Sequence, residues 1–421
     1  MRIGLFGLFG GGNSGNDASL ESMIAFLRRR GSDTHLVCIC ANPARVEQMY
    51  GIAAKRMSPE LDEQSIGNTI NRMLFRVPSR LFGIWYAIQE TRKLDVIIVP
   101  GTGFLDDFQD SPFGWPFTVF KWCLIAWLLR KKIVFVCIGA GPIRNRLSRF
   151  FMKKAAQFAT YRSYRDLASK QFMQSIGVNV DRDNIYPDIV FNLASPASPP
   201  PDGDAAISVG VGVMSYFGWS RGNTNRENIY RHYLDKLNAF VAWLLDNGFR
   251  VRLLTGDEGD WSAIQDFIER IKSTNRNVYD QVAAVRTHTL RELMTEIVKT
   301  DLVVVSRYHN LVSALKLGRP AISLEYSVKN RSLMVDMNLD DYCQSIETFD
   351  LDLLKQQFNR VLDQRLNLRN QILGWDEEFA RRLSTQEDCL LEFLFDRNSA
   401  VALPLCPLPA DGTPHSDRPI G

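Results

Sequence analysis

The sequence predicts an α/β protein built from two Rossmann-like, doubly wound domains. Short apolar runs, typical of buried parallel strands, alternate with segments of helical spacing along most of the chain. This alternation stops at residues 195–204, a Pro-rich stretch that cannot build a core, and then starts again. The chain has 421 residues, which is enough for two domains. Gly-rich and charged motifs follow the strand ends, where such sheets bind ligands, so we expect the domains to face a cleft.

The first domain is expected over residues 1–194. Its first helix, at 18–30, is indicated by apolar residues at helical spacing, and Gly31 is placed to end it. Residues 41–90 carry no clear pattern. The apolar runs predict strands at 2–8, 35–40, 95–100, 133–138 and 161–163, and helical spacing predicts helices at 115–129, 149–159 and 167–175.

The second domain is expected over residues 205–345, after a linker at 195–204. It begins with an apolar strand at 206–213 and an amphipathic helix at 230–246. Further strands are predicted at 250–255, 302–306 and 321–324, with helices at 261–273, 290–299 and 310–317. Residues 346–398 are expected to form C-terminal helices, and the Pro-rich end at 399–421 a disordered tail.

The most apolar segment runs from Phe113 to Leu129 and contains Trp115, Trp122 and Trp127. It is short for a membrane-spanning helix, and cations at 130–132 follow it. Two interpretations remain open. The segment is a helix of the core, or it lies on a bilayer surface with its tryptophans inward and the cations at the headgroups.

Composition narrows the class of function. The net charge is +3 and the cations are spread along the chain, so no nucleic-acid partner is indicated. The seven cysteines lack the spacing of a metal site or a disulfide framework, and we interpret them as reduced core thiols of a cytoplasmic protein. The chain enters a strand almost at once, so we expect no secretory signal.

A glycine-rich loop separates the first strand from the first helix. Its glycines allow a tight turn, and the free N–H groups of the helix N-terminus can bind an anion. Asn13 and Asp17 can instead cap the helix or hold the loop. The spacing is not that of a dinucleotide-binding fingerprint, so we expect no such cofactor. The candidate acceptor or loop residues are Gly12, Asn13, Gly15 and Asp17.

Two further motifs follow strands of the first domain. Thr102 can donate a hydrogen bond, and Asp106 can accept one from a sugar hydroxyl, although a solvated polar turn explains both residues equally. Arg165 can bind a phosphate or carboxylate through two parallel hydrogen bonds. The alternative for Arg165 is an ion pair with Asp166 or Asp188 that only holds the loop.

The strongest motif is Arg307-Tyr308-His309, which follows the strand at 302–306 directly before a helix. Arg307 supplies a planar anion clamp, and His309 can exchange protons near neutral pH. Lys329, after the next strand, adds a second cation. No His or Cys has metal-ligand spacing to another, so we expect no required metal.

Taken together, these motifs resemble the bacterial polysaccharide pyruvyl transferase family. The resemblance runs from Gly12 to Lys329, about three quarters of the chain. One departure is Asn16, where the family usually has Asp; the neighbouring Asp17 can take that place. The matching elements are Gly12-Asn13-Ser14-Gly15, Gly101-Thr102-Gly103, Gly139-Ala140-Gly141-Pro142, Arg165-Asp166, Pro187-Asp188, Arg307-Tyr308-His309, Gly318-x-Pro320 and Tyr326-x-x-Lys329.

This resemblance implies a glycosyltransferase-B-like fold, with the acceptor side in the first domain and the donor side in the second. It implies phosphoenolpyruvate as the donor and a sugar of a polysaccharide, or of its lipid-linked precursor, as the acceptor. The product is a pyruvate ketal, phosphate is released, and no cofactor is needed. Arg307, Lys329 and Arg165 then bind the donor together with His309, which is the candidate acid/base with Arg307 beside it. A lipid-linked acceptor implies peripheral contact with the inner face of the membrane.

Two other functions remain open. A nucleotide-sugar-dependent glycosyltransferase has the same fold and needs a base-and-ribose site, for which Gly256-Asp257-Glu258 is the candidate. A non-catalytic binding protein can also be built on this fold, because fold and motif do not prove turnover.

Overall fold

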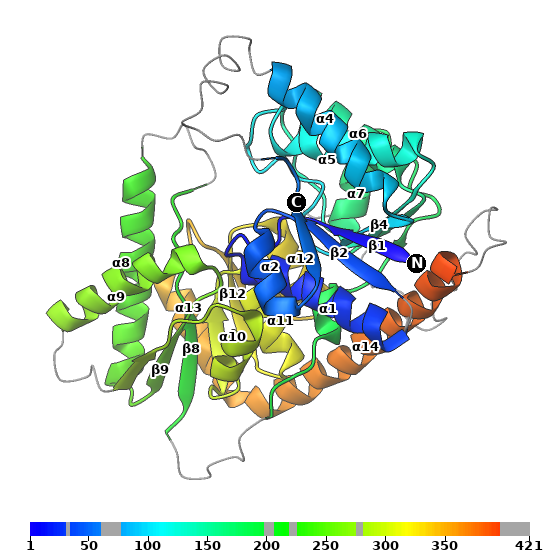
Figure 1. Cartoon of the computed structure of the whole chain (residues 1–421). Helices are drawn as coiled ribbons and strands as arrows, with labels where there is room; N and C mark the ends of the chain where they lie inside the picture. The colour runs from blue at the N-terminus through cyan, green and yellow to red at the C-terminus, as the bar shows by residue number, and fades with distance from the viewer. Residues whose placement is uncertain (31–33, 60–76, 198–205, 219–224, 275–280, 396–421) are drawn as a thin grey trace. The chain divides into compact units, whose positions relative to one another are not determined.

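The computed structural model describes residues 1–30, 34–59, 77–197, 206–218, 225–274 and 281–395 (Figure 1). These residues form two compact units. Of the described residues, unit 1 comprises Met1–Gly11, Ser19–Ile189 and 387–395, and unit 2 comprises Gly12–Ala18 and Val190–Gln386. This division differs from the expected one because the glycine-rich loop belongs to unit 2 and the end of the last helix to unit 1. The expected linker falls mostly, and the expected tail entirely, outside the described residues.

Unit 1 contains a seven-stranded sheet in the order β3-β2-β1-β4-β5-β6-β7, and every neighbouring pair is parallel. The first six places repeat the Rossmann order, in which strands are added first on one side of β1 and then, from β4 onward, on the other side. Apolar sequence explains the central strands, since Val-Ile-Ile-Val-Pro of β4 is buried throughout. The strands are β1 (Arg2–Phe6), β2 (His35–Cys40), β3 (Ala53–Arg56), β4 (Val96–Pro100), β5 (Lys132–Ile138), β6 (Tyr161–Tyr164) and β7 (Asn184–Ile185).

Side-chain caps mark where the helices of unit 1 begin. Asn42, Asn145 and Asp166 each accept hydrogen bonds from first-turn N–H groups. The first helix starts at Ser14 rather than at the expected residue 18, because Asn13 caps it there. The helices are α1 (Ser14–Arg30), whose first turn lies in unit 2, α2 (Pro43–Tyr50), α4 (Val77–Arg92), α5 (Trp115–Leu128), α6 (Arg146–Phe158) and α7 (Leu167–Ser175).

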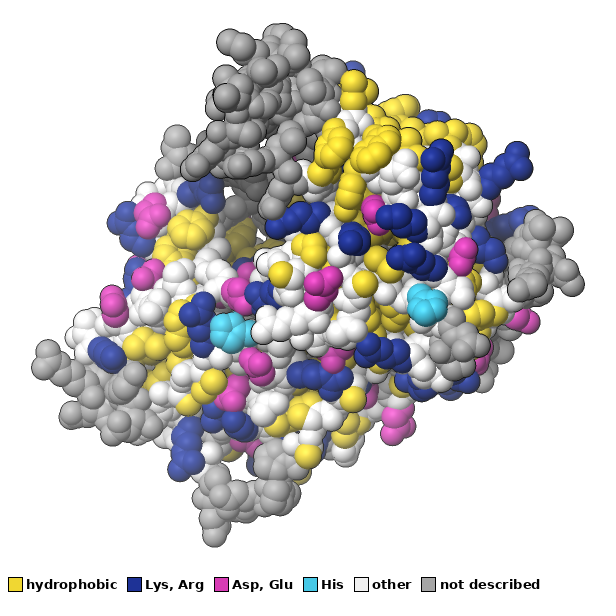
Figure 2. Space-filling model, in the orientation of Figure 1, with side chains coloured by type: hydrophobic (Ala, Val, Ile, Leu, Met, Phe, Trp, Pro, Cys, Tyr) yellow, Lys and Arg dark blue, Asp and Glu magenta, His cyan; other side chains and the backbone are white. Residues whose placement is uncertain are grey.

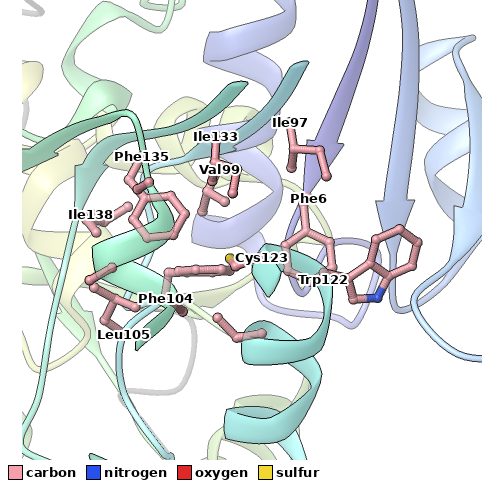
Figure 3. Close-up of a cluster of buried hydrophobic side chains, with 14 of the residues drawn as sticks. Phe6, Ile97, Val99, Phe104, Leu105, Trp122, Cys123, Ile133, Phe135 and Ile138 are labelled. Atoms are coloured by element: carbon pink, nitrogen blue, oxygen red, sulfur yellow. The ribbon is translucent and has the colours of Figure 1, made fainter. Parts of the chain in front are cut away.

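The core of unit 1 decides between the two interpretations of the apolar segment. Trp122 on α5 is fully buried against Phe6, 5.7 Å between ring centroids (Figure 3). Trp115 is also buried, whereas Trp127 is 52% exposed at the end of the helix. The segment is therefore a core helix for most of its length. A bilayer-surface helix with all three tryptophans in lipid is wrong, because two of them fill the core.

Unit 2 contains a second parallel sheet, in the order β10-β9-β8-β11-β12-β13. This is again the Rossmann order, in which the strand order reverses between β8 and β11. The predicted pair of doubly wound domains is therefore confirmed. The short edge strands β10 and β13 were not predicted, because three residues are too few to show an alternating or continuous apolar pattern. The strands are β8 (Ser208–Gly212), β9 (Arg250–Leu254), β10 (Val282–Ala284), β11 (Leu302–Val305), β12 (Ala321–Glu325) and β13 (Cys343–Ser345).

The last helix passes from unit 2 into unit 1. In unit 2, Phe379 packs edge-on against Phe191 at 4.9 Å. In unit 1, Glu387 accepts two hydrogen bonds from Arg29. The helices of this half are α8 (Arg226–Asp246), α9 (Trp261–Thr274), α10 (Leu290–Ile297), α11 (Tyr308–Lys316), α12 (Val328–Asp336), α13 (Leu351–Asp363) and α14 (Arg365–Phe395).

Two observations bear on where the protein acts. Cys38, Cys40, Cys123 and Cys137 are buried free thiols, whereas Cys389 is disulfide-bonded, so the expectation of reduced thiols is wrong for Cys389. Within the described ranges, every helix is too short or too polar to cross a membrane.

Candidate functional site

The centre of the candidate site is the junction between β11 and α11. Four buried apolar residues form β11, and Ser306 and Arg307 follow before α11 begins at Tyr308. Arg307 stands at the N-cap position of α11. Its backbone is extended, with φ −66° and ψ 134°, and its side chain makes no cap hydrogen bond to the helix. The neighbouring strand β12 leads in the same way to α12, where Lys329 is the second residue. The two cations thus lie at the carboxyl ends of adjacent parallel strands.

Asp260 holds Arg307 in place. Its carboxylate, fully buried, accepts hydrogen bonds from Arg307 Nε at 2.8 Å and Nη2 at 2.7 Å. It also accepts the Ser215 N–H at 3.0 Å, just after β8. This bidentate pair uses one edge of the guanidinium; Nη1 makes no hydrogen bond within the described residues. Arg307 is therefore oriented by Asp260, with one nitrogen remaining for a ligand.

Asp260 and Arg307 also affect the pKa values of this part of the site. Burial opposes ionisation of Arg307, but Asp260 outweighs it, so the pKa of Arg307 is raised and the guanidinium stays charged. Tyr326 and Asp257 contribute in the same direction. Burial raises the pKa of Asp257, and Arg307 partly counteracts this. The sequence alone did not identify Asp260, although its position three residues after Asp257 at a strand end was a usable signal.

His309 lies directly against Gly15. A Cβ atom at Gly15 would meet His309 Nδ1 at 1.8 Å and Cγ at 2.2 Å, so no side chain fits there without moving the imidazole. Gly15 belongs to the first turn of α1, within the segment that joins unit 2. The candidate residues Gly15 and His309, 294 positions apart in the chain, are thus brought together.

The glycine-rich loop is attached to the turn after β9. Asn13 forms an isolated antiparallel bridge with Asp257, and Gly12 O accepts the N–H of Glu258 at 3.2 Å. Ser14 Oγ donates to Gly256 O at 2.8 Å. These contacts explain why the loop belongs to unit 2, and they engage the Gly256-Asp257-Glu258 segment that was the candidate ribose site.

Asn13 caps α1 rather than leaving its N-terminus open. Its Oδ1 accepts the N–H groups of Gly15 and Asn16, both at 3.1 Å. Asp17 is buried in the same turn, and its N–H donates to Asn13 O at 3.2 Å. An anion at this helix start would compete with Asn13, so the geometry favours the structural interpretation of Asn13.

The N-termini of α11 and α12 are different. Among the described residues, neither Arg307 nor Ser327 makes a side-chain cap hydrogen bond. Uncapped N–H groups and the helix dipole favour an anion. In α11, the amide of Asn310 is fully buried, and neither its oxygen nor its nitrogen has a hydrogen-bond partner within the described ranges. A buried amide of this kind is usually explained by a bound water, ion or ligand.

Lys329 lies between two tyrosine rings. Its Nζ is 5.5 Å from the ring centroid of Tyr308 and 5.1 Å from that of Tyr326. The Tyr308 ring is in turn edge-on to His309 at 5.2 Å. Lys329 has no ion pair with a carboxylate in the described part of the chain. We call Arg307, His309 and Lys329 the cationic site; the arrangement can hold a small anion beside an imidazole.

Arg165 is placed in unit 1 rather than with the cationic site. Its side chain is only 5% exposed, with Nη1 3.4 Å from Asp188 Oδ2 and Nε 3.5 Å from Asp166 Oδ2. Gly139 allows this position, since a Cβ there would lie 2.5 Å from Arg165 Nη2. The geometry favours the ion pair that holds the loop.

Thr102 and Asp106 lie in the same unit. Thr102 is buried and has φ 69°, a conformation that costs a β-branched residue of the order of 1–3 kcal/mol. Thr102 O accepts the N–H of Gly139 at 2.7 Å. Asp106 accepts the N–H of Phe108 at 2.9 Å, as in a polar turn. Within the described residues, no three His, Cys, Asp or Glu side chains are grouped so that they could hold a metal ion.

Comparison with protein families gives a match for this chain. The family model described as polysaccharide pyruvyl transferase matches residues 13–328. A comparison with curated proteins gives no match.

Solved structures show the same fold at low identity. Staphylococcus aureus MnaA, in its UDP co-structure, has a TM-score of 0.57 and 12% identity, covering 93% of this chain and 96% of that chain. A putative UDP-N-acetylglucosamine 2-epimerase from Listeria monocytogenes has a TM-score of 0.59 and 11% identity, with 94% and 98% covered. Anabaena Alr3699/HepE, in complex with UDP and glucose, has a TM-score of 0.56 and 12% identity, with 94% and 99% covered.

These likenesses confirm the expected glycosyltransferase-B-like fold. The family match covers about three quarters of the chain, from the capped start of α1 to the first residue of α12. It includes Arg307 and His309, and it confirms the resemblance drawn from the motifs. The chain belongs to the polysaccharide pyruvyl transferase family.

Proposed function

We propose that the protein transfers the pyruvyl group of phosphoenolpyruvate to two hydroxyls of one sugar, in a polysaccharide or its lipid-linked precursor. A pyruvate ketal forms and phosphate is released. The observation that carries this proposal is the cationic site, in which Arg307 and Lys329 stand at two uncapped helix N-termini beside His309. A small trianion needs several cations at close range, and this is the part of unit 2 that supplies them.

The proposed binding roles follow from the contacts. Arg307, oriented by Asp260, presents Nη1 to the phosphate or carboxylate of the donor. Lys329 neutralises a second charge, and the tyrosines on either side restrict its ammonium group. The N–H groups that open α11 and α12 bind the phosphate oxygens and stabilise the charge that develops as phosphate leaves.

The proposed chemistry uses one acid/base. Protonation of the methylene carbon makes C2 electrophilic, and a sugar hydroxyl forms the first C–O bond to it. A second hydroxyl forms the other bond as the C2–O bond to phosphate breaks. One hydroxyl proton ends on the new methyl group and the other on phosphate, so the step balances without a cofactor. His309 moves these protons, because imidazole is both acid and base near neutral pH.

The proposed location is the cytoplasm. The buried free thiols of β2, α5 and β5 suit a reducing compartment. The proposed acceptor is lipid-linked, which places the reaction at the inner face of a membrane. We propose no metal requirement, and loss of turnover in a chelator would contradict this.

Thermal unfolding with phosphoenolpyruvate, and separately with UDP-sugars, is the first experiment. A ligand at 100 times its Kd adds about 2.7 kcal/mol to the free energy of unfolding. We expect a shift with phosphoenolpyruvate that is lost in Lys329→Met, which leaves no carboxylate unpaired. Lys355→Met on α13, which removes only a surface ion pair with Asp352, is the control and should keep the shift.

A shift with a UDP-sugar alone would replace the proposal with a glycosyltransferase. The observation behind that alternative is that two of the structures reported above contain UDP. A phosphoenolpyruvate shift without phosphate release from any sugar acceptor would favour a non-catalytic binding protein. Release of phosphate together with a ketal in the product supports the transferase.

A further inference from the structure

The surface of unit 1 over α4, α5 and α6 exposes large aromatic side chains that the proposed chemistry does not use. Trp85 on α4 is 54% exposed, Trp127 on α5 is 52% and Phe150 on α6 is 46%. Hydrophobic side chains gather over these helices, with Lys and Arg side chains beside them (Figure 2). We define the aromatic face as Phe82, Trp85, Phe113, Trp127, Leu128 and Phe150.

Ring contacts join the members of the aromatic face. The guanidinium of Arg80, at the start of α4, lies 4.8 Å above the ring of Phe113. Phe113 and Phe150 both pack against Phe151, at 6.2 and 5.8 Å. The helices themselves are neighbours, α4 beside α5 and α5 beside α6 (Figure 1). The exposed aromatics therefore form one surface rather than scattered residues.

The charged residues in this part of the sequence are all basic. Residues 111–165 contain eleven Lys or Arg and neither Asp nor Glu, whereas the whole chain has a net charge of +3. Lys121 is buried and Arg162 and Arg165 are paired with carboxylates, so these three do not add to the surface charge. On and before α6, Arg144, Arg146 and Arg149 are exposed. Arg130 is exposed just after Trp127 and Leu128. Apolar rings and cations thus share the same face.

We propose that the aromatic face binds an anionic lipid bilayer. Trp and Phe rings insert at the level of the headgroups, and Lys and Arg beside them are attracted to anionic lipids. A second copy of the chain is disfavoured, because an isologous contact would bring two strongly cationic faces together. Nucleic acid is disfavoured, because its charged phosphate backbone would not bury the exposed apolar side chains of Trp127 and Leu128.

The inference adds a partner to the proposed function but does not depend on its chemistry. A lipid-linked acceptor is held at the bilayer, so docking by unit 1 raises the local acceptor concentration. Vesicle binding needs neither donor nor acceptor. Failure of vesicle binding and failure of pyruvyl transfer are therefore separate results.

Flotation of the full-length protein with vesicles tests the inference. The vesicles are phosphatidylcholine alone or phosphatidylcholine with phosphatidylglycerol. We expect binding to the anionic vesicles that weakens as NaCl rises from about 0.1 to 0.5 M. The double variants Trp85→Ser/Trp127→Ser and Arg146→Glu/Arg149→Glu should each lower the partition coefficient by about tenfold or more. The matched control Arg365→Glu/Leu366→Ser, on exposed positions of α14, should bind as wild type does.

Two results would overturn the inference. One is wild-type protein that does not float with anionic vesicles, or that floats equally well with both face variants. The other is a wild-type dimer that the face variants convert to monomer, which would assign the face to a second copy. The phosphoenolpyruvate-induced thermal shift, measured on every variant, shows that the fold and the cationic site are intact.

Discussion

Arg165 in unit 1 and Arg307 in unit 2 both follow a buried parallel strand, and both are held by buried carboxylates. Arg165 lies between Asp166 and Asp188 with 5% of its side chain exposed. Among the described side chains, Arg307 is hydrogen-bonded to Asp260 alone, and it keeps 22% of its side chain exposed. Two carboxylates more than neutralise Arg165, whereas one carboxylate orients Arg307 and leaves it available. An arginine that follows a parallel strand thus holds a loop in one unit and presents a cation in the other.

The strongest test of this comparison is to remove the imidazole of His309, which comes two residues after Arg307 in the chain. His309→Ala should lower turnover by about 10²–10⁴-fold, because a positioned acid/base contributes that much. His232→Ala, an exposed histidine on α8, is the control and should keep wild-type turnover. Steady-state phosphate release measures both. A His309→Ala enzyme with more than about a third of wild-type turnover would remove His309 from this role.

The carboxylates themselves sharpen the comparison. Asp260→Asn removes the carboxylate that accepts two hydrogen bonds from Arg307, and breaking a buried pair in this way costs about 3–5 kcal/mol of stability. Asp188→Asn leaves Asp166 beside Arg165 and should cost less. Denaturant unfolding gives both free energies. We also expect Asp260→Asn to raise the KM for phosphoenolpyruvate and Asp188→Asn to leave it unchanged; equal effects of the two substitutions would contradict the difference between the units.

The buried lysines offer a second contrast between the units. Lys316 in unit 2 lies 3.7 Å from Asp376 and donates to Phe191 O at 2.6 Å. Lys121 in unit 1 is buried on α5 with no hydrogen bond or ion pair in the described part of the chain. Burial lowers the pKa of Lys121 to about 8 from 10.5. Lys121→Met should therefore raise the free energy of unfolding at pH 7 by up to about 3 kcal/mol, and Lys316→Met should lower it.

The sign of the pH dependence follows from the same shift. The charged amine of Lys121 destabilises the folded state fully below about pH 8, and this effect fades as pH rises from 8 to 10.5. The stability of wild type relative to Lys121→Met should thus increase between pH 7 and 9.5, as measured by paired thermal melts. A constant difference across that range would mean that Lys121 keeps its ordinary pKa.

The smallest expected effect concerns the loop that unit 2 takes from the start of the chain. Gly15→Ala places a methyl 1.8 Å from His309 Nδ1 and must move the imidazole, so turnover should fall by about tenfold. Gly11→Ala is the matched control, because a Cβ there meets nothing within 4 Å. The free energies of unfolding of the two variants should agree within about 1 kcal/mol. Wild-type turnover in Gly15→Ala would show that the position of His309 is not critical.

Local patterns in the sequence were enough for the fold class. Apolar runs predicted β1, β4, β5, β8 and β11, and helical spacing predicted α5, α8 and α9, because both periodicities depend on neighbouring residues. The family resemblance rested on short motifs that each follow a strand. Where local signals were weak, prediction failed: β3, β10 and β13 are short edge strands with few buried side chains.

The partners of the site residues depended on which distant segments the tertiary structure brings together. Asp260 meets Arg307 because β9 and β11 flank β8 in the sheet. The order of strands in a sheet cannot be predicted from a short segment of sequence. Gly15 meets His309 because the glycine-rich loop joins unit 2, and Arg165 is neutralised because Asp188 returns beside β6. By itself, the sequence predicted which residues carry the chemistry and indicated that they stand at strand ends. The tertiary structure decided which of these charges pair, since electrostatic pairing depends on distance in space and not on separation along the chain.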